Sequence, residues 1–481
     1  MYVLSLLTSL IPILISLVLY FKKNNNKILN RILCIAPLGI SLILNIVICF
    51  TGHLEPLVLF KISEDLLIVA QIDTTSKFFA ILISLIMIIV TIYSFKYFEE
   101  DERKNHFDAF FMLSYGALMM LTYSGNLITM YITFEMVTLL SMPLVLHEKT
   151  KESIDAALKY LIYSVGGAFL GFIGVVYLSS CSGNFFVLGG SLVTSSINKN
   201  VFNVVLLLML IGFGTKCGMF PLHNWLPTAH PVAPAPASSI LSGIITKSGV
   251  IAIIRIVYYV VGTEFIRGTW LHYTWIILIL ITILLGSFMA CVQKNLKKRL
   301  AFSSVSQISY VLLGISMFNT TALQGAYAQV VSHAVIKVCL FLVAGVLIHV
   351  LHIHNVDELD GVGKKMPITM WCYTICALGL IGVPPTSGFV SKWYLATGAL
   401  SSGLKVIDII APIVLIISAI LTAYYLLDCT IRAFFPSKKD VNYEKVKEEP
   451  LFVVPLIILA SATILIGLCA SPLLNLIASY M

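Results

Sequence analysis

The sequence predicts an all-α polytopic membrane protein. Of its 481 residues, 59% are hydrophobic and only 11% are charged, and the mean hydropathy is +0.97. Apolar runs of about twenty residues, the length that an α-helix needs to cross a bilayer, recur along nearly the whole chain. Since an open chain can span lipid only as helices, we expect transmembrane α-helices and no soluble catalytic domain.

About fourteen apolar segments fit transmembrane helices. They are expected at residues 2–21, 32–52, 78–97, 108–125, 127–146, 155–180, 201–220, 237–258, 270–292, 301–317, 322–350, 367–402, 407–431 and 450–476. A basic loop follows the first segment in place of a small-residue cleavage site, so we expect a retained helix and no removable signal peptide. Residues 53–76 alternate polar with apolar and predict a hairpin or an amphipathic element on the outer face.

The basic residues predict the orientation. Loops that follow odd-numbered segments hold twenty Lys and Arg residues, whereas loops that follow even-numbered segments hold five. The positive-inside rule then places the odd loops in the cytoplasm and both termini on the outer face of a cell membrane, which we expect to be prokaryotic. This distribution also explains the net charge of +8 without a nucleic-acid partner.

Six basic residues fall inside the predicted spans. They are Lys159, Lys216, Lys247, Arg255, Lys337 and Lys392. Lys159 and Arg255 lie near predicted helix ends, where long side chains can reach the interface. Lys216, Lys247 and Lys392 lie too deep for that. A charge at mid-depth costs at least about 2.5 kcal/mol, so these three predict a functional site with a charged partner.

Glu135 is the predicted partner, because it is the one carboxylate in the middle of the fifth segment. Burial favours the neutral form of a lysine and a nearby carboxylate favours its charged form. A movable Glu135 would therefore load or unload Lys216 with a proton. A static Glu–Lys pair that joins two helices is the alternative.

Two segments carry prolines at depth. Pro221 and Pro227 follow Lys216, and Pro384 and Pro385 precede Lys392. Proline removes a backbone donor and interrupts a helix, and irregular backbone is tolerated in a membrane only beside protein or water. These prolines predict two broken helices beside cavities, although kinks that serve only packing are the alternative.

The pairing of a break with a lysine predicts two inverted five-helix repeats. The expected organisation is a three-helix N-terminal segment with an outer-face hairpin (1–107), two five-helix units (108–258 and 270–431), and a cytoplasmic loop with a final helix (432–481). The repeat is imperfect, because the second unit has no counterpart of Glu135.

Three histidines are candidates for proton transfer. His333 lies one turn before Lys337 and suits a proton relay, although a packed histidine is the alternative. His223 and His230 flank the first break and are candidates to feed protons into it. Ten scattered cysteines without a C-x-x-C pair predict no metal or cofactor in this chain.

Four phrases resemble a known family. They are PLHNWLPTAH (221–230), PASSILSG (236–243) followed by Lys247, HAVIK (333–337) and PPTSGFVSKW (384–393). Together they resemble the antiporter-like subunits shared by respiratory complex I (NADH dehydrogenase), Mrp-type Na+/H+ antiporters and membrane-bound hydrogenases. The phrase around His230 is more similar to the Mrp and hydrogenase branch.

The resemblance implies a central hydrophilic axis. Along it Glu135 pairs with Lys216, and protons pass through Lys247 toward His333, Lys337 and Lys392. It implies an ion-translocating subunit of a multisubunit complex, with other antiporter-like chains as partners and a redox module or a counter-ion gradient as the driver. No redox site is expected in this chain. A stand-alone cation/proton antiporter and a non-conducting structural subunit are the alternatives, and either H+ or Na+ fits as the coupled ion.

Overall fold

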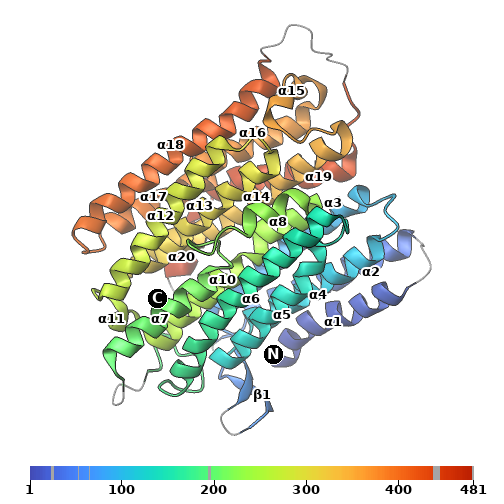
Figure 1. Cartoon of the computed structure of the whole chain (residues 1–481). Helices are drawn as coiled ribbons and strands as arrows, with labels where there is room; N and C mark the ends of the chain where they lie inside the picture. The colour runs from blue at the N-terminus through green and yellow to red at the C-terminus, as the bar shows by residue number, and fades with distance from the viewer. Residues whose placement is uncertain (23–26, 53, 64–65, 193–196, 437–444, 479–481) are drawn as a thin grey trace. The chain divides into compact units, whose positions relative to one another are not determined.

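The computed structural model describes residues 1–22, 27–52, 54–63, 66–192, 197–436 and 445–478. The described chain is mostly helical (Figure 1). Ten of its helices are long and apolar enough to cross a membrane. The prediction of an all-α membrane fold is therefore confirmed.

The N-terminal part contains α1 (Tyr2–Phe21), α2 (Lys27–Cys49), β1 (Leu57–Lys61), β2 (Leu67–Ala70), α3 (Thr74–Tyr97), α4 (Lys104–Thr122), α5 (Leu127–Val145), α6 (Lys151–Ser179) and α7 (Lys199–Gly214). The middle contains α8 (Leu226–Val232), α9 (Ala235–Ile240), a π-helical stretch (Leu241–Ile245), α10 (Lys247–Ile254), a second π-helical stretch (Arg255–Val261), α11 (Thr263–Ile266) and α12 (Trp270–Val292). The C-terminal part contains α13 (Leu296–Ser316), α14 (Thr320–Leu351), a 3₁₀ turn (Val356–Glu358), α15 (Val362–Lys365), α16 (Pro367–Ile381), α17 (Ser387–Leu400), α18 (Val406–Phe434), α19 (Pro450–Leu468) and α20 (Ala470–Ala478).

Each of the fourteen predicted segments contains helix, and three of them are interrupted. The segment at 201–220 is helical only to Gly214, the segment at 367–402 is divided into α16 and α17, and the segment at 450–476 is divided into α19 and α20. The number fourteen for the membrane crossings and the side on which the termini lie stay predictions. Residues 437–444 of the predicted cytoplasmic loop lie outside the described residues.

Asparagine and threonine residues define several helix starts. The side chain of Asn126 accepts a hydrogen bond from the backbone N–H of Thr129 at 2.9 Å, and that of Thr150 accepts one from Ser153 at 3.1 Å. Such caps satisfy backbone donors that have no partner within the helix. They fix where α5 and α6 begin, which are the two helices that hold the first part of the candidate site.

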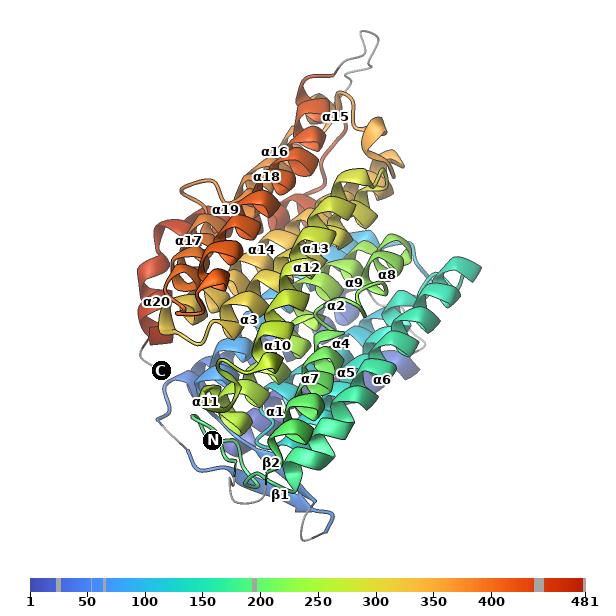
Figure 2. The same cartoon turned by 60° about the vertical axis from the view of Figure 1, so that its left-hand side comes forward.

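The chain divides into two compact units. The first comprises residues 1–91, 98–217 and 245–275. Within it α1 packs against α4, α4 against α5, α5 against α6, and α6 against α7, so these helices form a row (Figures 1 and 2). α10 packs against α7 at the end of that row.

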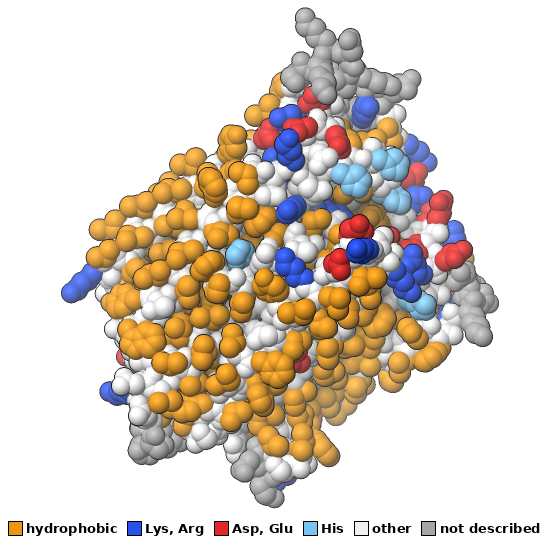
Figure 3. Space-filling model, viewed as in Figure 1, with side chains coloured by type: hydrophobic (Ala, Val, Ile, Leu, Met, Phe, Trp, Pro, Cys, Tyr) orange, Lys and Arg blue, Asp and Glu red, His pale blue; other side chains and the backbone are white. Residues whose placement is uncertain are grey.

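The second unit comprises residues 92–97, 218–244 and 276–481. Its centre is the 32-residue helix α14, which packs against α9, α13, α16, α17 and α19. On the face seen in Figure 3, hydrophobic side chains cover α12 and α18, whereas charged side chains gather near α15. The unit boundaries follow packing contacts, and the predicted inverted repeats with their boundaries stay a prediction.

The predicted hairpin is present. β1 and β2 pair antiparallel, with Leu57 opposite Ala70 and a bulge between Val58 and Phe60. The backbone N–H of Val69 donates to the hydroxyl of Thr129 at 2.9 Å, which ties the hairpin to the first turn of α5.

Candidate functional site

Lys216 lies in the first of the two helix interruptions that the prolines predict. α7 ends at Gly214, and residues 215–218 form turns before Pro221 is reached. The lysine was expected deep inside a helix, but it lies two residues beyond the helix end. Its side chain is fully buried.

Glycines on α6 bring the end of α7 close. A Cβ on Gly167 would lie 2.4 Å from Thr215 Oγ1, and a Cβ on Gly174 would lie 2.6 Å from Met209 Sδ. The space at Gly212 of α7 is equally small, because a Cβ added there would lie 2.4 Å from the carbonyl oxygen of Gly167. Small residues let two membrane helices approach at backbone distance. Because of this packing, the residues that follow α7 lie directly against α6.

The amine of Lys216 meets a tyrosine on α6. Its Nζ donates a hydrogen bond to the hydroxyl of Tyr160 at 2.7 Å and lies 4.4 Å from the centre of the Tyr160 ring. The Tyr160 hydroxyl also lies 2.8 Å from the Ser141 hydroxyl on α5. A buried ammonium requires such polar contacts, because it has lost its water.

Glu135 lies near the middle of α5 and close enough to Lys216 to interact electrostatically. The neighbouring ring of Phe134 is centred 6.0 Å from Lys216 Nζ. Glu135 Oε1 is buried and accepts no hydrogen bond from the described residues. The predicted Glu135–Lys216 neighbourhood therefore has a third member, Tyr160, which sequence reasoning missed.

Lys247 begins α10, directly after the π-helical stretch at Leu241–Ile245 and Thr246. It is buried, and it lies near enough to Cys217 to interact electrostatically. A Cβ on Gly249 would lie 2.7 Å from Cys217 Sγ and 3.0 Å from Lys216 Cβ, so α10 packs directly on the chain around Lys216. Glu135, Lys216 and Lys247 thus form one group in the first unit. π-Helical segments are rare and occur frequently at functional sites.

His333 and Lys337 lie one turn apart on α14, and both are fully buried. Lys337 Nζ donates to the carbonyl oxygen of Leu300 at 2.8 Å and to the hydroxyl of Ser303, both on α13. Lys337 Nζ lies 6.0 Å from the centre of the Phe341 ring. The second unit therefore holds a buried lysine that donates hydrogen bonds to α13.

Lys392 lies on α17, beyond the second interruption. Gly382 ends α16 with φ +95°, a conformation that suits glycine, and Pro384 and Pro385 separate α16 from α17. The break exposes carbonyl groups at the end of α16. Lys392 Nζ donates to those of Leu380 at 2.5 Å and Ile381 at 2.7 Å.

Amide side chains connect three helices of the second unit. The Oε1 of Gln329 on α14 accepts a hydrogen bond from the Ser391 hydroxyl on α17 at 2.6 Å. Its Nε2 donates to Gln307 Oε1 on α13 at 3.0 Å. Gln329 precedes His333 by one turn, and Ser391 precedes Lys392 by one residue, so this bridge lies beside both predicted pathway residues.

The two histidines near the first interruption differ in their surroundings. His223 is partly exposed and stacks on Phe220 with ring centres 5.9 Å apart. His230, on α8 after Pro227, is fully buried and stacks on Phe341 at 4.6 Å. Neither ring nitrogen of His230 makes a hydrogen bond to a described residue.

Arg255 was expected to reach the interface, but it is fully buried. It forms an ion pair with Asp73, with Nη2 3.0 Å from Oδ1. Its guanidinium also lies 4.6 Å from the centre of the Tyr259 ring. Asp73 directly precedes α3, far away in the sequence, so spacing along the chain gave no indication of the pair.

Comparisons with known proteins agree with the resemblance. Residues 124–420 match the family described as NADH:quinone oxidoreductase/Mrp antiporter, transmembrane. NADH-quinone oxidoreductase subunit N of Desulforudis audaxviator is 32% identical over 388 residues, which cover 78% of this chain and 76% of that protein. A Na(+)/H(+) antiporter subunit of Bacillus subtilis is 26% identical over 468 residues, covering 96% of this chain and 93% of that protein.

A solved structure shares the fold. A chain of the Mrp complex from Dietzia sp. superimposes with a TM-score of 0.87 and 22% identity, covering 100% of this chain and 97% of that one. The relatives include a quinone oxidoreductase subunit and an antiporter subunit, so the preference for the Mrp and hydrogenase branch stays a prediction. Because the family match spans more than half of the sequence, the chain belongs to the NADH:quinone oxidoreductase/Mrp antiporter family of transmembrane proteins.

Proposed function

We propose that this chain is the ion-translocating subunit of a multisubunit membrane complex and that the ion it moves is the proton. The observation that carries the proposal is the buried group around Lys216. A lysine that is fully buried, hydrogen-bonded to a tyrosine hydroxyl and close to a half-buried carboxylate is costly to keep in a membrane. Its retention is explained by proton transfer.

Glu135 acts as the switch in this proposal. Burial favours the neutral amine and a nearby carboxylate favours the ammonium. Because Glu135 Oε1 accepts no hydrogen bond from a described residue, a movement of the carboxylate relative to Lys216 would break no hydrogen bond at that oxygen. Its approach would load Lys216 with a proton, and its withdrawal would release that proton.

The remaining predicted residues form the continuation of the route. Lys247 receives the proton in the first unit, and His333, Lys337 and Lys392 carry it in the second. Lys337 and Lys392 already contact polar backbone and hydroxyl groups, which would hold the charged form of each lysine. His223 and His230 are proposed to deliver protons to the first helix interruption, beside Lys216.

Energy has to come from partners or from a second ion. Moving one proton against the membrane potential costs about 2.3 kcal/mol per 100 mV. The similar proteins are named as subunits of a quinone oxidoreductase and of a Na(+)/H(+) antiporter, and both names imply further subunits. We propose that this chain holds no cofactor, that other membrane subunits surround it, and that Na+ is the alternative coupled ion.

Purification of the tagged chain in mild detergent, followed by mass spectrometry of the partners, tests the assembly. Co-purifying iron–sulfur or nickel-hydrogenase subunits would indicate a redox-driven pump. Small hydrophobic subunits with a second antiporter-like chain would indicate an Mrp-type exchanger. A chain that purifies alone and still moves ions would refute the subunit assignment.

A substitution of Glu135 tests the switch. Glu135→Gln keeps the shape of the side chain but removes its charge, so proton translocation in proteoliposomes should fall by at least about tenfold. Glu152→Gln is the matched control, because Glu152 lies exposed in the first turn of α6. Equal translocation by both variants would contradict the proposed role of Glu135.

A further inference from the structure

A cavity of about 730 Å³ lies in the first unit between the start of α5 and the end of α6. Its size is in the range of sites that hold small molecules. The start of α5, the end of α6, the loop after α6 and the hairpin line it, and none of the described lining residues is charged. The cavity is separate from the buried lysines.

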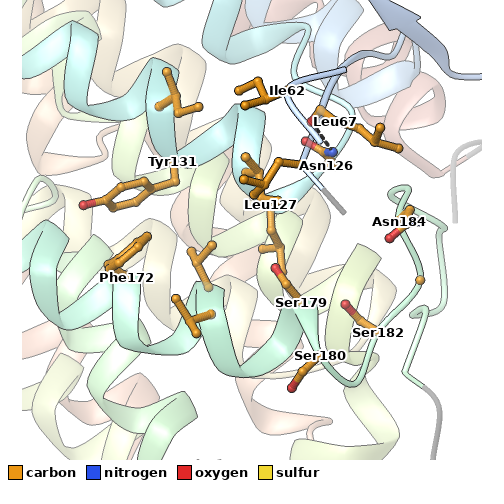
Figure 4. Close-up of a pocket in the computed structure, with 16 residues that line it drawn as sticks. Ile62, Leu67, Asn126, Leu127, Tyr131, Phe172, Ser179, Ser180, Ser182 and Asn184 are labelled. Atoms are coloured by element: carbon orange, nitrogen blue, oxygen red, sulfur yellow. Dashed lines mark hydrogen bonds between the residues drawn. The ribbon is translucent and has the colours of Figure 1, made fainter. Parts of the chain in front are cut away.

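Polarity changes from one end of this cavity to the other (Figure 4). Tyr131 and Phe172 lie together at the apolar end, with ring centres 4.9 Å apart. At the other end, where α6 stops, Ser179, Ser182 and Asn184 line the cavity. Their side chains make no hydrogen bond to a described residue. The cavity is therefore shaped for an amphiphile whose polar part lies at the helix ends.

The length of the cavity matches one leaflet of a bilayer. Phe172 lies on α6 and Ser180 directly follows the last residue of that helix, so their separation of eight residues corresponds to about 12 Å along the helix axis. Half of a hydrocarbon core of about 30 Å is similar. A single acyl chain that enters at the membrane surface would reach Tyr131.

The cavity is continuous with an apolar helix surface. Val176, which lines it, is 57% exposed, and Ile173 and Phe169 on the same helix are 48% and 61% exposed. A face of this composition is suited to hydrocarbon, so lipid chains have lateral access to the cavity. The buried floor consists of Leu127 and Val175, which are apolar as well.

We propose that this cavity binds one acyl chain of a membrane lipid with a zwitterionic or uncharged head group. Hydroxyl and amide groups of Ser179, Ser182 and Asn184 contact the head group, and the chain lies along Leu127 and Val176 to Tyr131. An anionic lipid gains no advantage, because the described lining offers no cation. Tyr131 precedes Glu135 by one turn of α5, so the end of the chain excludes water from this side of Glu135.

Photo-cross-linking tests the site. The full chain, with whatever subunits co-purify, is placed in nanodiscs that contain phosphatidylcholine with a diazirine on one acyl chain. Cross-links mapped by mass spectrometry should fall on the lining residues of α5 (residues 127, 128, 131 and 132) and of α6 (residues 172, 175 and 176). Val176→Trp fills the cavity and should lower these cross-links about tenfold, a loss comparable to two buried methylenes.

Ile173→Trp is the matched control. It adds the same side chain to the same exposed face but outside the lining, so cross-linking in the cavity should persist. Equal cross-linking in the wild type and in Val176→Trp would overturn the proposal. So would a benzophenone placed at residue 176 that captures a neighbouring subunit in the intact complex, because a protein would then cover the cavity. Displacement of the probe by phosphatidylglycerol but not by unlabelled phosphatidylcholine would refute the head-group assignment.

Discussion

The amine of Lys216 donates a hydrogen bond to the hydroxyl of Tyr160 at 2.7 Å and lies 4.4 Å from the centre of its ring. One tyrosine thus supplies both an oxygen acceptor and an aromatic face to a buried cation. The same hydroxyl contacts Ser141, so α5, α6 and the end of α7 meet at this point.

Tyr160→Phe should slow proton translocation about tenfold, because it removes the hydroxyl that accepts a hydrogen bond from Lys216 and keeps the ring. Tyr163→Phe, on the same helix, is the control and should translocate at the wild-type rate. Uptake of protons into proteoliposomes measures both. Wild-type translocation by Tyr160→Phe would show that the hydroxyl plays no part.

Gly382→Ala should destabilise the second unit by about 1–2 kcal/mol, because the position has φ +95° and the new Cβ would lie 2.9 Å from Lys392 Cδ. Gly166→Ala is the control, since its Cβ would meet nothing within 4 Å, and it should be neutral or slightly stabilising. Thermal melting in detergent compares the two. A melting temperature of Gly382→Ala at or above that of Gly166→Ala would contradict this account of the break.

Removal of the Arg255 side chain should lower the free energy of unfolding by about 3–5 kcal/mol, because it leaves the carboxylate of Asp73 without its buried partner. Arg255→Gln and Asp73→Asn, alone and together, form a double-mutant cycle. If the pair stabilises the fold, the double variant melts at a higher temperature than the sum of the single effects predicts. Additive losses would show that the two residues act independently. Arg267→Gln, at an exposed arginine of the same unit, is the control.

Stability should depend on pH through Asp101, in the loop between α3 and α4. Burial alone would raise the pKa of this carboxyl, but hydrogen bonds from His147 and from the backbone N–H of Arg103 outweigh it, so the pKa is lowered. A lowered folded-state pKa stabilises the fold above the unfolded value of about 3.9, and this contribution is lost as the pH falls through the folded pKa.

Asp101→Asn should therefore melt at a lower temperature than the wild type at pH 7, and the difference should shrink below about pH 4. The effect should be at most about 1 kcal/mol, because the Asp101 side chain is 28% exposed. Glu102→Gln is the neighbouring control. A difference in melting temperature between Asp101→Asn and the wild type that stays constant from about pH 7 to pH 3 would show that the ionisation of Asp101 does not cause it.

The sequence predicted the helices well because hydrophobicity and length are local properties. Each predicted span contains helix, and the two breaks beside Lys216 and Lys392 lie where glycine and proline occur. The end of α7 is the instructive difference. Helix stops at Gly214, before any proline, close to the point where Gly167 and Gly212 let α6 and α7 approach at backbone distance.

The sequence did not predict which residues that are far apart in the chain contact each other. Tyr160 and Ser141 carry no signal that distinguishes them from packed residues, and Asp73 is separated from Arg255 by more than 180 positions. Glu135 and Lys216 could be identified from the sequence because charged residues inside a membrane segment are rare. Hydroxyl and amide groups such as Gln329 are tolerated in many helix interfaces, so their pattern alone could not single them out.

The most direct test of the account is proton translocation by Lys216→Ala. The complex that contains the variant is reconstituted in proteoliposomes, and proton uptake is followed together with the activity of its partner subunits. Lys199→Ala is the control, because Lys199 is exposed at the other end of α7. The account predicts that Lys216→Ala assembles normally and moves no protons, whereas Lys199→Ala behaves as the wild type. Undiminished proton uptake by Lys216→Ala would contradict it.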